Sequence, residues 1–222
     1  MKFVEERVRP EKAALIVVDV QNDFCHPEGA CAARGNDVSA VKAMMPRLHE
    51  LIAAAKSHEV PVIYIQTFHE EATDSEAWKS RSDGRSSQVC RTGSWGAEFY
   101  EVTPQPGDII VNKHRYSAFI NTRLDSVLRT LKVETLILTG VSTNVCVEST
   151  ARHGYMLDYN IVLVKDACAA YSAKAHEMTL ENISMFFGSV VETGDLLSVW
   201  ERMAAGASSR SRAEARRALS HR

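Results

Sequence analysis

The fold is decided by AALIVVDV at residues 13–20 and by five later runs of the same character. These runs are apolar and rich in β-branched residues throughout, whereas strands with one exposed face alternate between apolar and polar side chains. The later runs lie at 60–67, 108–112, 135–139, 160–165 and 188–192. Continuous apolar runs are typical of strands buried on both faces, so the sequence predicts a mainly parallel sheet of about six strands.

Amphipathic stretches separate these runs, with apolar residues at the three- and four-residue spacing of one helix face. They lie at 38–59, 122–131, 144–153, 173–186 and 195–203. Because strands and helices alternate without a break in composition, we predict one α/β domain over residues 1–203. Its expected architecture is three-layered, α/β/α, with a Rossmann-like sheet. The basic end of the chain, residues 204–222, is expected to be a mobile tail.

Composition narrows the classes of function. The chain has 222 residues, 45% of them hydrophobic, and a formal net charge of -2. This apolar content supports a substantial core and excludes disorder as the main state. The near-neutral balance argues against nucleic acid as a partner, and no apolar run approaches the ~18–20 residues of a membrane helix. We therefore expect a cytoplasmic protein that binds neither nucleic acid nor membrane.

Cys146 is the cysteine with the strongest local case for chemistry. The five cysteines include no Cys-x-x-Cys pair, so neither a disulfide framework nor a zinc knuckle is indicated. Gly140 ends a strand run, and Ser142 and Thr143 are good N-cap residues for the helix that follows. Free amides at a helix start favour a thiolate, so we predict a lowered pKa for the Cys146 thiol. The same amides could hold an oxyanion.

The partners of this thiol remain open on position alone. Ligands of open α/β sheets bind at the carboxyl ends of the strands. Asp19 and Lys113 lie at such ends and could supply a base and a cation. Asp166 is nearly as good a base by position, and His114 could act in a Cys–His arrangement.

Three segments resemble motifs of the isochorismatase-like cysteine hydrolase superfamily. TGVSTNVCVESTARHGY (139–155) is similar to its nucleophile motif. LIVVDVQNDF (15–24) is similar to its first-strand motif, and PGDIIVNKHRYSAFINTRLD (106–125) to its lysine motif. The three occur in the family's order, and the resemblance covers about residues 13–200.

This resemblance implies roles that position alone left open. It assigns the catalytic triad to Asp19, Lys113 and Cys146 in preference to the alternatives above. It also implies a cis peptide bond between Val141 and Ser142, and an oxyanion hole formed by the backbone amides of Ser142 and Cys146.

Departures from other members narrow the expected reaction. True isochorismatases lack the nucleophilic cysteine, so Cys146 points to amide hydrolysis. Nicotinamidases carry a metal-binding Asp-x-His…His cluster where residues 66–69 here offer a single histidine, so neither a metal nor a cofactor is expected. The segments KHRYSAF (113–119), VCVEST (145–150) and FFGSV (186–190) are most similar to the ureide-cleaving members, namely ureidoacrylate amidohydrolase and the biuret and triuret hydrolases.

The resemblance therefore predicts a metal-independent amidohydrolase that cleaves a C–N bond in a small ureide or carbamoyl amide through a thioester-like intermediate. A nicotinamidase-like amidase and a non-catalytic binding protein are the alternatives. Phe24 and Tyr116 adjoin the motifs and are predicted to contact the substrate. Trp95, in the long irregular stretch at 70–106, could close over the site from its own or a neighbouring chain. Because the family is commonly oligomeric, we expect a homo-oligomer.

Overall fold

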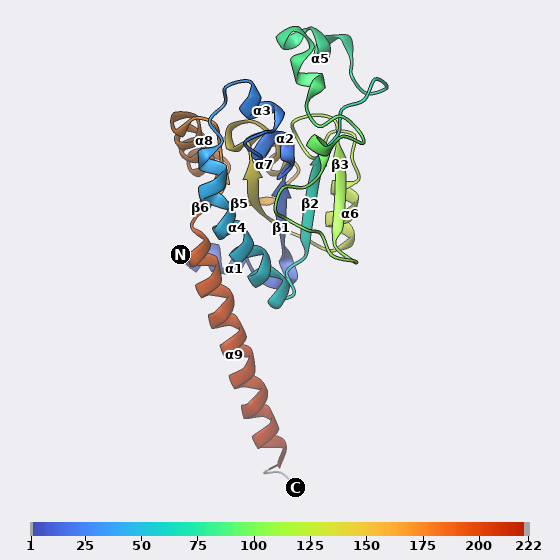
Figure 1. Ribbon diagram of the computed structural model, residues 1–222. Helices are drawn as coiled ribbons and strands as arrows, with labels where there is room; N and C mark the ends of the chain where they lie inside the picture. Colours follow the sequence, from blue (N-terminus) through green and yellow to red (C-terminus); the bar gives the residue numbers. More distant parts are fainter. Residues whose placement is uncertain (1, 220–222) are drawn as a thin grey trace.

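A single parallel sheet lies between two layers of helices (Figure 1). The computed structural model describes the backbone of residues 2–219, and side chains at 4–206 except 82, 83 and 85. The strands are β1 (Ala13–Val18), β2 (Val62–Thr67), β3 (Ile109–Lys113), β4 (Thr135–Val141), β5 (Asn160–Ala169) and β6 (Gly188–Val191). They are all parallel, in the order β3-β2-β1-β4-β5-β6, which confirms the predicted fold class.

The helices agree closely with the amphipathic stretches of the sequence. They are α1 (Lys2–Arg7), α2 (Asn22–Cys25), α3 (Ala30–Ala33), α4 (Ser39–Ser57), α5 (Glu76–Ser80), α6 (Leu124–Thr130), α7 (Glu148–Met156), α8 (Ala173–Phe186) and α9 (Thr193–Leu219). Short 3₁₀ turns form η1 (Pro10–Lys12), η2 (Arg81–Gln88) and η3 (Trp95–Ala97), and a π-helical turn forms η4 (Thr143–Val147). Residues 144–153, predicted as one helix, therefore begin in a π turn before α7.

Both faces of the sheet are covered, which explains why the strand runs do not alternate. In β1, Leu15 and Val17 pack into the core formed with α4 and α9. Ile16 and Val18 point the other way, into the core formed with α6, α7 and α8. Since every side chain of this strand is buried, an apolar residue is favoured at each position.

The topology places a crevice where β1 lies between β2 and β4. The strand order reverses there, and such switch points are where open α/β sheets bind ligands. Gly140 allows the two strands to come together at this point. Its φ is +103°, and a Cβ atom on it would lie 2.1 Å from the Val18 carbonyl oxygen. Any other residue would force the strands apart.

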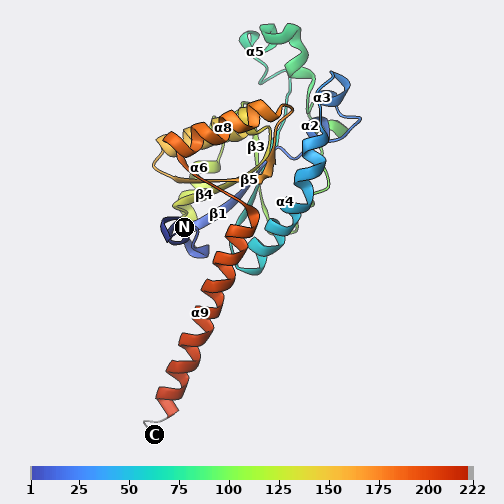
Figure 2. The same cartoon turned by 90° about the vertical axis from the view of Figure 1, so that its left-hand side faces the viewer.

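The last helix extends beyond the stretch predicted at 195–203. Helix α9 does not end near residue 203 but continues to Leu219, projecting away from the sheet (Figures 1 and 2). Residues 204–219 are rich in alanine and arginine, which have high helix propensity, and this accounts for the continuation. That the tail is mobile stays a prediction. No helix in the described part of the chain combines the length and apolarity needed to cross a membrane.

The long irregular stretch at 70–106 is partly helical. Its residues 75–88, which we call the cap, contain α5 and η2 and stand above the carboxyl edge of the sheet (Figures 1 and 2). The cap thus lies over the end of the sheet at which the switch point opens.

Candidate active site

Three strand ends bring Asp19, Lys113 and Cys146 together. Asp19 follows β1, Lys113 ends β3, and Cys146 lies in the π turn after β4. Lys113 Nζ lies 2.8 Å from Asp19 Oδ2 and 3.5 Å from Cys146 Sγ. All three side chains are buried. The structure therefore has the juxtaposition that the sequence motifs predicted.

Local backbone geometry fixes the Asp19 carboxylate. Asp19 has a φ of +52°, in the left-handed region, so the chain turns sharply as it leaves β1. The Thr67 hydroxyl at the end of β2 donates to Asp19 Oδ1 over 2.9 Å. Oδ2 is left on the side of Lys113, whose Nζ also donates to the Arg115 carbonyl over 3.0 Å. A buried carboxylate is tolerated here because an ammonium faces it.

The π turn holds Cys146 at the start of the helical segment. The Ser142 carbonyl accepts hydrogen bonds from the amides of Val145 (3.0 Å) and Val147 (3.2 Å). The Val141–Ser142 peptide bond is cis, as the resemblance implied. The Ser142 side chain does not cap the helix, however, because it donates to Asn144 Oδ1 (3.0 Å).

The electrostatics of the thiol contradict one prediction. Burial raises the pKa of Cys146 above its usual value, and the nearby Lys113 ammonium only partly opposes this while the Asp19 carboxylate adds to it. The predicted lowering is therefore wrong, because ionising the thiol beside an already neutral ion pair would leave a net charge buried. For Lys113, burial lowers the pKa, but Asp19 and Cys146 outweigh it and raise the pKa overall. Burial therefore favours the neutral form of the Cys146 thiol.

The two alternative bases are engaged elsewhere. Asp166 Oδ1 accepts hydrogen bonds from the amide (2.8 Å) and hydroxyl (3.0 Å) of Thr193, at the start of α9. His114 Nδ1 bonds with the Phe68 carbonyl over 2.8 Å. The geometry therefore separates Asp19 from these candidates, which sequence position could not do.

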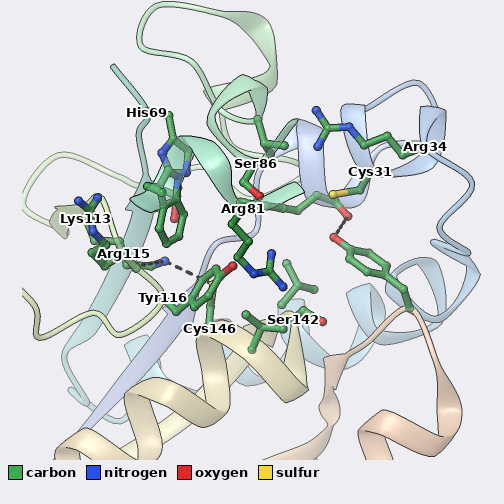
Figure 3. Close-up of a pocket in the computed structure, with 17 residues that line it drawn as sticks. Cys31, Arg34, His69, Arg81, Ser86, Lys113, Arg115, Tyr116, Ser142 and Cys146 are labelled. Carbon is green, nitrogen blue, oxygen red and sulfur yellow. Dashed lines mark hydrogen bonds between the residues drawn. The ribbon is translucent and has the colours of Figure 1, made fainter. Parts of the chain in front are cut away.

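We call Asp19, Lys113 and Cys146 the floor of the site. A cavity of about 260 Å³ opens above this floor (Figure 3). Lys113 and Cys146 line this cavity. Phe24, Tyr116 and Ser142, which were also predicted from the sequence to belong to the site, line it as well. The thiol is therefore accessible from a space large enough for a small molecule.

Trp95 is not part of this wall. It lies in η3, is 47% exposed, and packs edge-on against His26 with 5.0 Å between the ring centroids. Its backbone carbonyl accepts a hydrogen bond from Asn22 Nδ2, which holds η3 against α2. Trp95 was predicted to close over the site from its own or a neighbouring chain, and it does not line the cavity of its own chain.

Sequence reasoning missed the residues that the cap contributes. Trp78, from α5, lines the cavity, stacks on His69 at 5.3 Å and tilts against Tyr116 at 5.0 Å. Arg81, from η2, lines it too. A tryptophan among polar residues was a signal for a binding wall, but Trp78 and Trp95 both carry it, so the sequence could not choose between them.

His69, the single histidine of residues 66–69, is bonded to its neighbours. Its Nδ1 lies 3.2 Å from Asp74 Oδ1, and Asp74 Oδ2 accepts a hydrogen bond of 2.7 Å from Arg91. We call these three residues the clasp, since Asp74 and Arg91 flank the cap in sequence. The described residues contain no group of three or more His, Cys, Asp or Glu placed to hold a metal.

Comparison with known proteins adds to this geometry. The family model for the isochorismatase domain matches residues 13–195. The chain belongs to the isochorismatase family. The match spans all three of the strand ends that form the floor, so the family's domain includes the whole candidate site.

Two relatives and one solved structure show the extent of the likeness. The ureidoacrylate amidohydrolase RutB of Methylobacterium radiotolerans is 38% identical over 89% of this chain and 84% of its own length. RutB of Pseudomonas syringae pv. syringae is 35% identical over 87% of this chain and 86% of its own length. A cysteine hydrolase from Pseudomonas syringae pv. phaseolicola 1448A superposes with a TM-score of 0.82 at 31% identity, covering 88% of this chain and 95% of that one.

Proposed function

We propose that this protein is a cysteine amidohydrolase that cleaves a C–N amide bond in a small ureide or carbamoyl amide, of the ureidoacrylate type. The observation that carries the proposal is the contact of Lys113 Nζ with both Asp19 (2.8 Å) and Cys146 (3.5 Å) at the wall of a cavity. A buried nucleophile, base and cation in contact are what covalent catalysis at a carbonyl requires. Both RutB relatives are named ureidoacrylate amidohydrolase, which supports the substrate class.

The first half of the reaction forms a covalent intermediate. Asp19 takes the thiol proton as Cys146 Sγ attacks the substrate carbonyl carbon, so no thiolate has to persist in the resting site. Lys113 compensates the negative charge that moves from the carboxylate to the sulfur and on to the carbonyl oxygen. The backbone amides of Ser142 and Cys146 would hold that oxyanion.

The second half releases the products. The tetrahedral adduct collapses, the C–N bond breaks, and Asp19 returns its proton to the departing nitrogen. A water molecule, deprotonated by Asp19, then attacks the thioester-like carbonyl and the Cys146 sulfur leaves with that proton. One carboxylate serves as base and acid in turn, so the cycle needs no second titrating group.

The remaining expectations from the sequence belong to the same proposal. We expect catalysis to continue after treatment with a chelator, since the proposed steps use only protein groups. We also expect the enzyme to be a cytoplasmic homo-oligomer with a small-molecule substrate. Size-exclusion chromatography with light scattering measures the assembly directly.

A substrate screen tests the proposal. Ammonia release is measured with ureidoacrylate, biuret, triuret, N-carbamoyl amino acids and nicotinamide, for the wild type and for Cys146→Ala. We expect turnover of at least one ureide by the wild type and none by the variant. Turnover of nicotinamide alone, or an active Cys146→Ala protein, would overturn the proposal.

A further inference from the structure

The described residues that line the cavity carry an excess of positive charge. Among the described residues that line it are Lys113 and three arginines, Arg34, Arg81 and Arg115, but no aspartate or glutamate. The Lys113 charge is already compensated by Asp19. The described lining therefore carries more positive than negative charge, and partial exclusion of water strengthens the effect of that charge on a ligand.

The three arginines are not equivalent. Both terminal nitrogens of Arg115 are engaged, with the carbonyls of His114 (2.6 Å) and Thr73 (3.0 Å), and its guanidinium lies over the Trp78 ring at 5.1 Å. Arg34 lies at one side of the cavity (Figure 3). Arg81 differs from both in position: it reaches down from the cap into the middle of the cavity, above Ser142 and Cys146 (Figure 3). A ligand attacked by Cys146 would therefore have its far end near Arg81.

The clasp and an aromatic contact fix the part of the chain that carries Arg81. Asp74 is 7% exposed and bonds both His69 (3.2 Å) and Arg91 (2.7 Å), which ties the two ends of the cap to the exit of β2. Three residues before Arg81, the Trp78 ring is stacked on His69. A guanidinium on an anchored segment is preorganised for binding, so less entropy is lost when it meets an anion.

We propose that Arg81 binds a carboxylate of the substrate, and that the enzyme consequently prefers ureido acids to neutral ureides such as biuret. This inference rests on the proposed function, which supplies the ureido group of the substrate. It adds that the opposite end of the substrate is negatively charged. The planar guanidinium can donate two parallel hydrogen bonds to a carboxylate, which gives orientation as well as affinity. A carboxylate held there would direct the ureido carbonyl toward Cys146.

Alkylation of Cys146 tests the anion site without any turnover. The rates with iodoacetate, which is anionic, and iodoacetamide, which is neutral, are measured on the Cys146 peptide by mass spectrometry, with glutathione as the reference thiol. Both reagents consume the same thiolate, so their rate ratio does not depend on the pKa of the thiol. We expect the ratio to exceed that of glutathione by about 10-fold or more in the wild type, from a charge-assisted contact.

Two variants assign this preference to one residue. Arg81→Gln should bring the ratio close to that of glutathione. Lys79→Gln removes a positive charge two residues away, in α5, but Lys79 does not line the cavity, so this variant should keep the wild-type ratio. An unchanged ratio in Arg81→Gln, or an equal loss in both variants, would overturn the inference.

Turnover of a matched pair of substrates completes the test. The pair is a ureido acid and its primary amide, which differ only in the charge at the far end. Arg81→Gln should lower kcat/KM for the acid by about 10- to 100-fold and for the amide by a much smaller factor, with Arg81→Lys in between. Equal wild-type rates on both substrates would contradict the carboxylate site but not the proposed function. If neither substrate were turned over while the alkylation ratio still depended on Arg81, the proposed function would be contradicted and the anion site would be supported.

Discussion

The floor of the cavity and the cap above it are built in opposite ways. Asp19 and Lys113 are 0% and 1% exposed; Asp19 follows β1, which pairs with β2 and β4, and Lys113 ends the edge strand β3, which pairs with β2. The cap has a five-residue helix, a 3₁₀ turn and exposed residues such as Arg81, and packs near a small cluster of Val89, Cys90 and Ala97. The sheet thus fixes the reacting groups, whereas side chains on the cap can change without disturbing the core.

This contrast predicts different kinetic signatures for the two regions. Substitutions in the floor should lower kcat, because they remove groups needed when bonds are made and broken. Substitutions in the cap should act mainly on KM or on substrate preference, because they remove contacts made equally before and during the reaction.

The largest effect is expected from Cys146→Ala. Without the nucleophile, kcat should fall by at least about 10,000-fold, leaving only the contribution of binding and the oxyanion hole. The matched control is Cys168→Ala, which removes another buried thiol, one that does not line the cavity. Ammonia release measures the activity of both variants, and thermal melts check that both are folded. A Cys168→Ala protein as inactive as Cys146→Ala would mean that the loss is not specific to the floor.

The floor is also the part of the site that sequence could predict. Asp19 and Lys113 follow apolar strand runs, and parallel strands bring their carboxyl ends to one edge regardless of the loops between them. The direction in which the pKa of the Cys146 thiol is shifted was predicted wrongly. It depends on burial and on the charges of Lys113 and Asp19 beside the thiol, which no local sequence pattern reveals.

The cap could not be predicted in the same way. Its position depends on Asp74 bonding to Arg91, 17 residues away, and on Trp78 packing against rings from two other segments. No periodicity records such contacts. The prediction of Trp95 as a lining residue used its place in the same irregular stretch, but nearness along a loop does not fix where a side chain points.

The second largest effect concerns the ion pair of the floor. Lys113→Met should lower kcat by about 100- to 1,000-fold by removing the stabilising cation. It should also cost about 3 to 5 kcal/mol in the free energy of unfolding, because it leaves the Asp19 carboxylate buried without a partner. The double variant Asp19→Asn/Lys113→Met should regain much of that stability but no activity. Urea unfolding measures the three proteins, and a Lys113→Met protein as stable as the wild type would contradict the pairing.

A pair of tryptophans tests the cap more directly. Trp78→Ala should raise KM by about 10-fold with kcat nearly unchanged, because it removes an aromatic wall and no reacting group. Trp95→Ala is the control, since that ring lies outside the cavity of its own chain. Steady-state kinetics on one ureide compare the two. A larger rise in KM for Trp95→Ala would break the contrast and indicate that a neighbouring chain supplies this ring to the site.

The smallest effect is expected at the clasp and appears only on acidification. Burial lowers the pKa of His69 below its usual value, an effect that the Asp74 carboxylate only partly offsets and that Lys113 and His114 reinforce. The unfolded chain therefore binds a proton more readily than the folded one. The stability that neutral His69 contributes is complete above the usual histidine pKa of about 6.5 and is lost as the pH falls through the folded-state value.

His69→Gln removes this titration and can still donate a hydrogen bond to Asp74. Between pH 7.5 and 5.5, the melting temperature of the wild type should therefore fall further than that of the variant, by a few degrees at most for a chain of this size. His176, whose pKa burial also lowers, is present in both proteins and cancels in the difference. Equal falls in the two proteins would show that the pKa of His69 is the same in the folded and unfolded chain. The clasp would then not shield His69 from water.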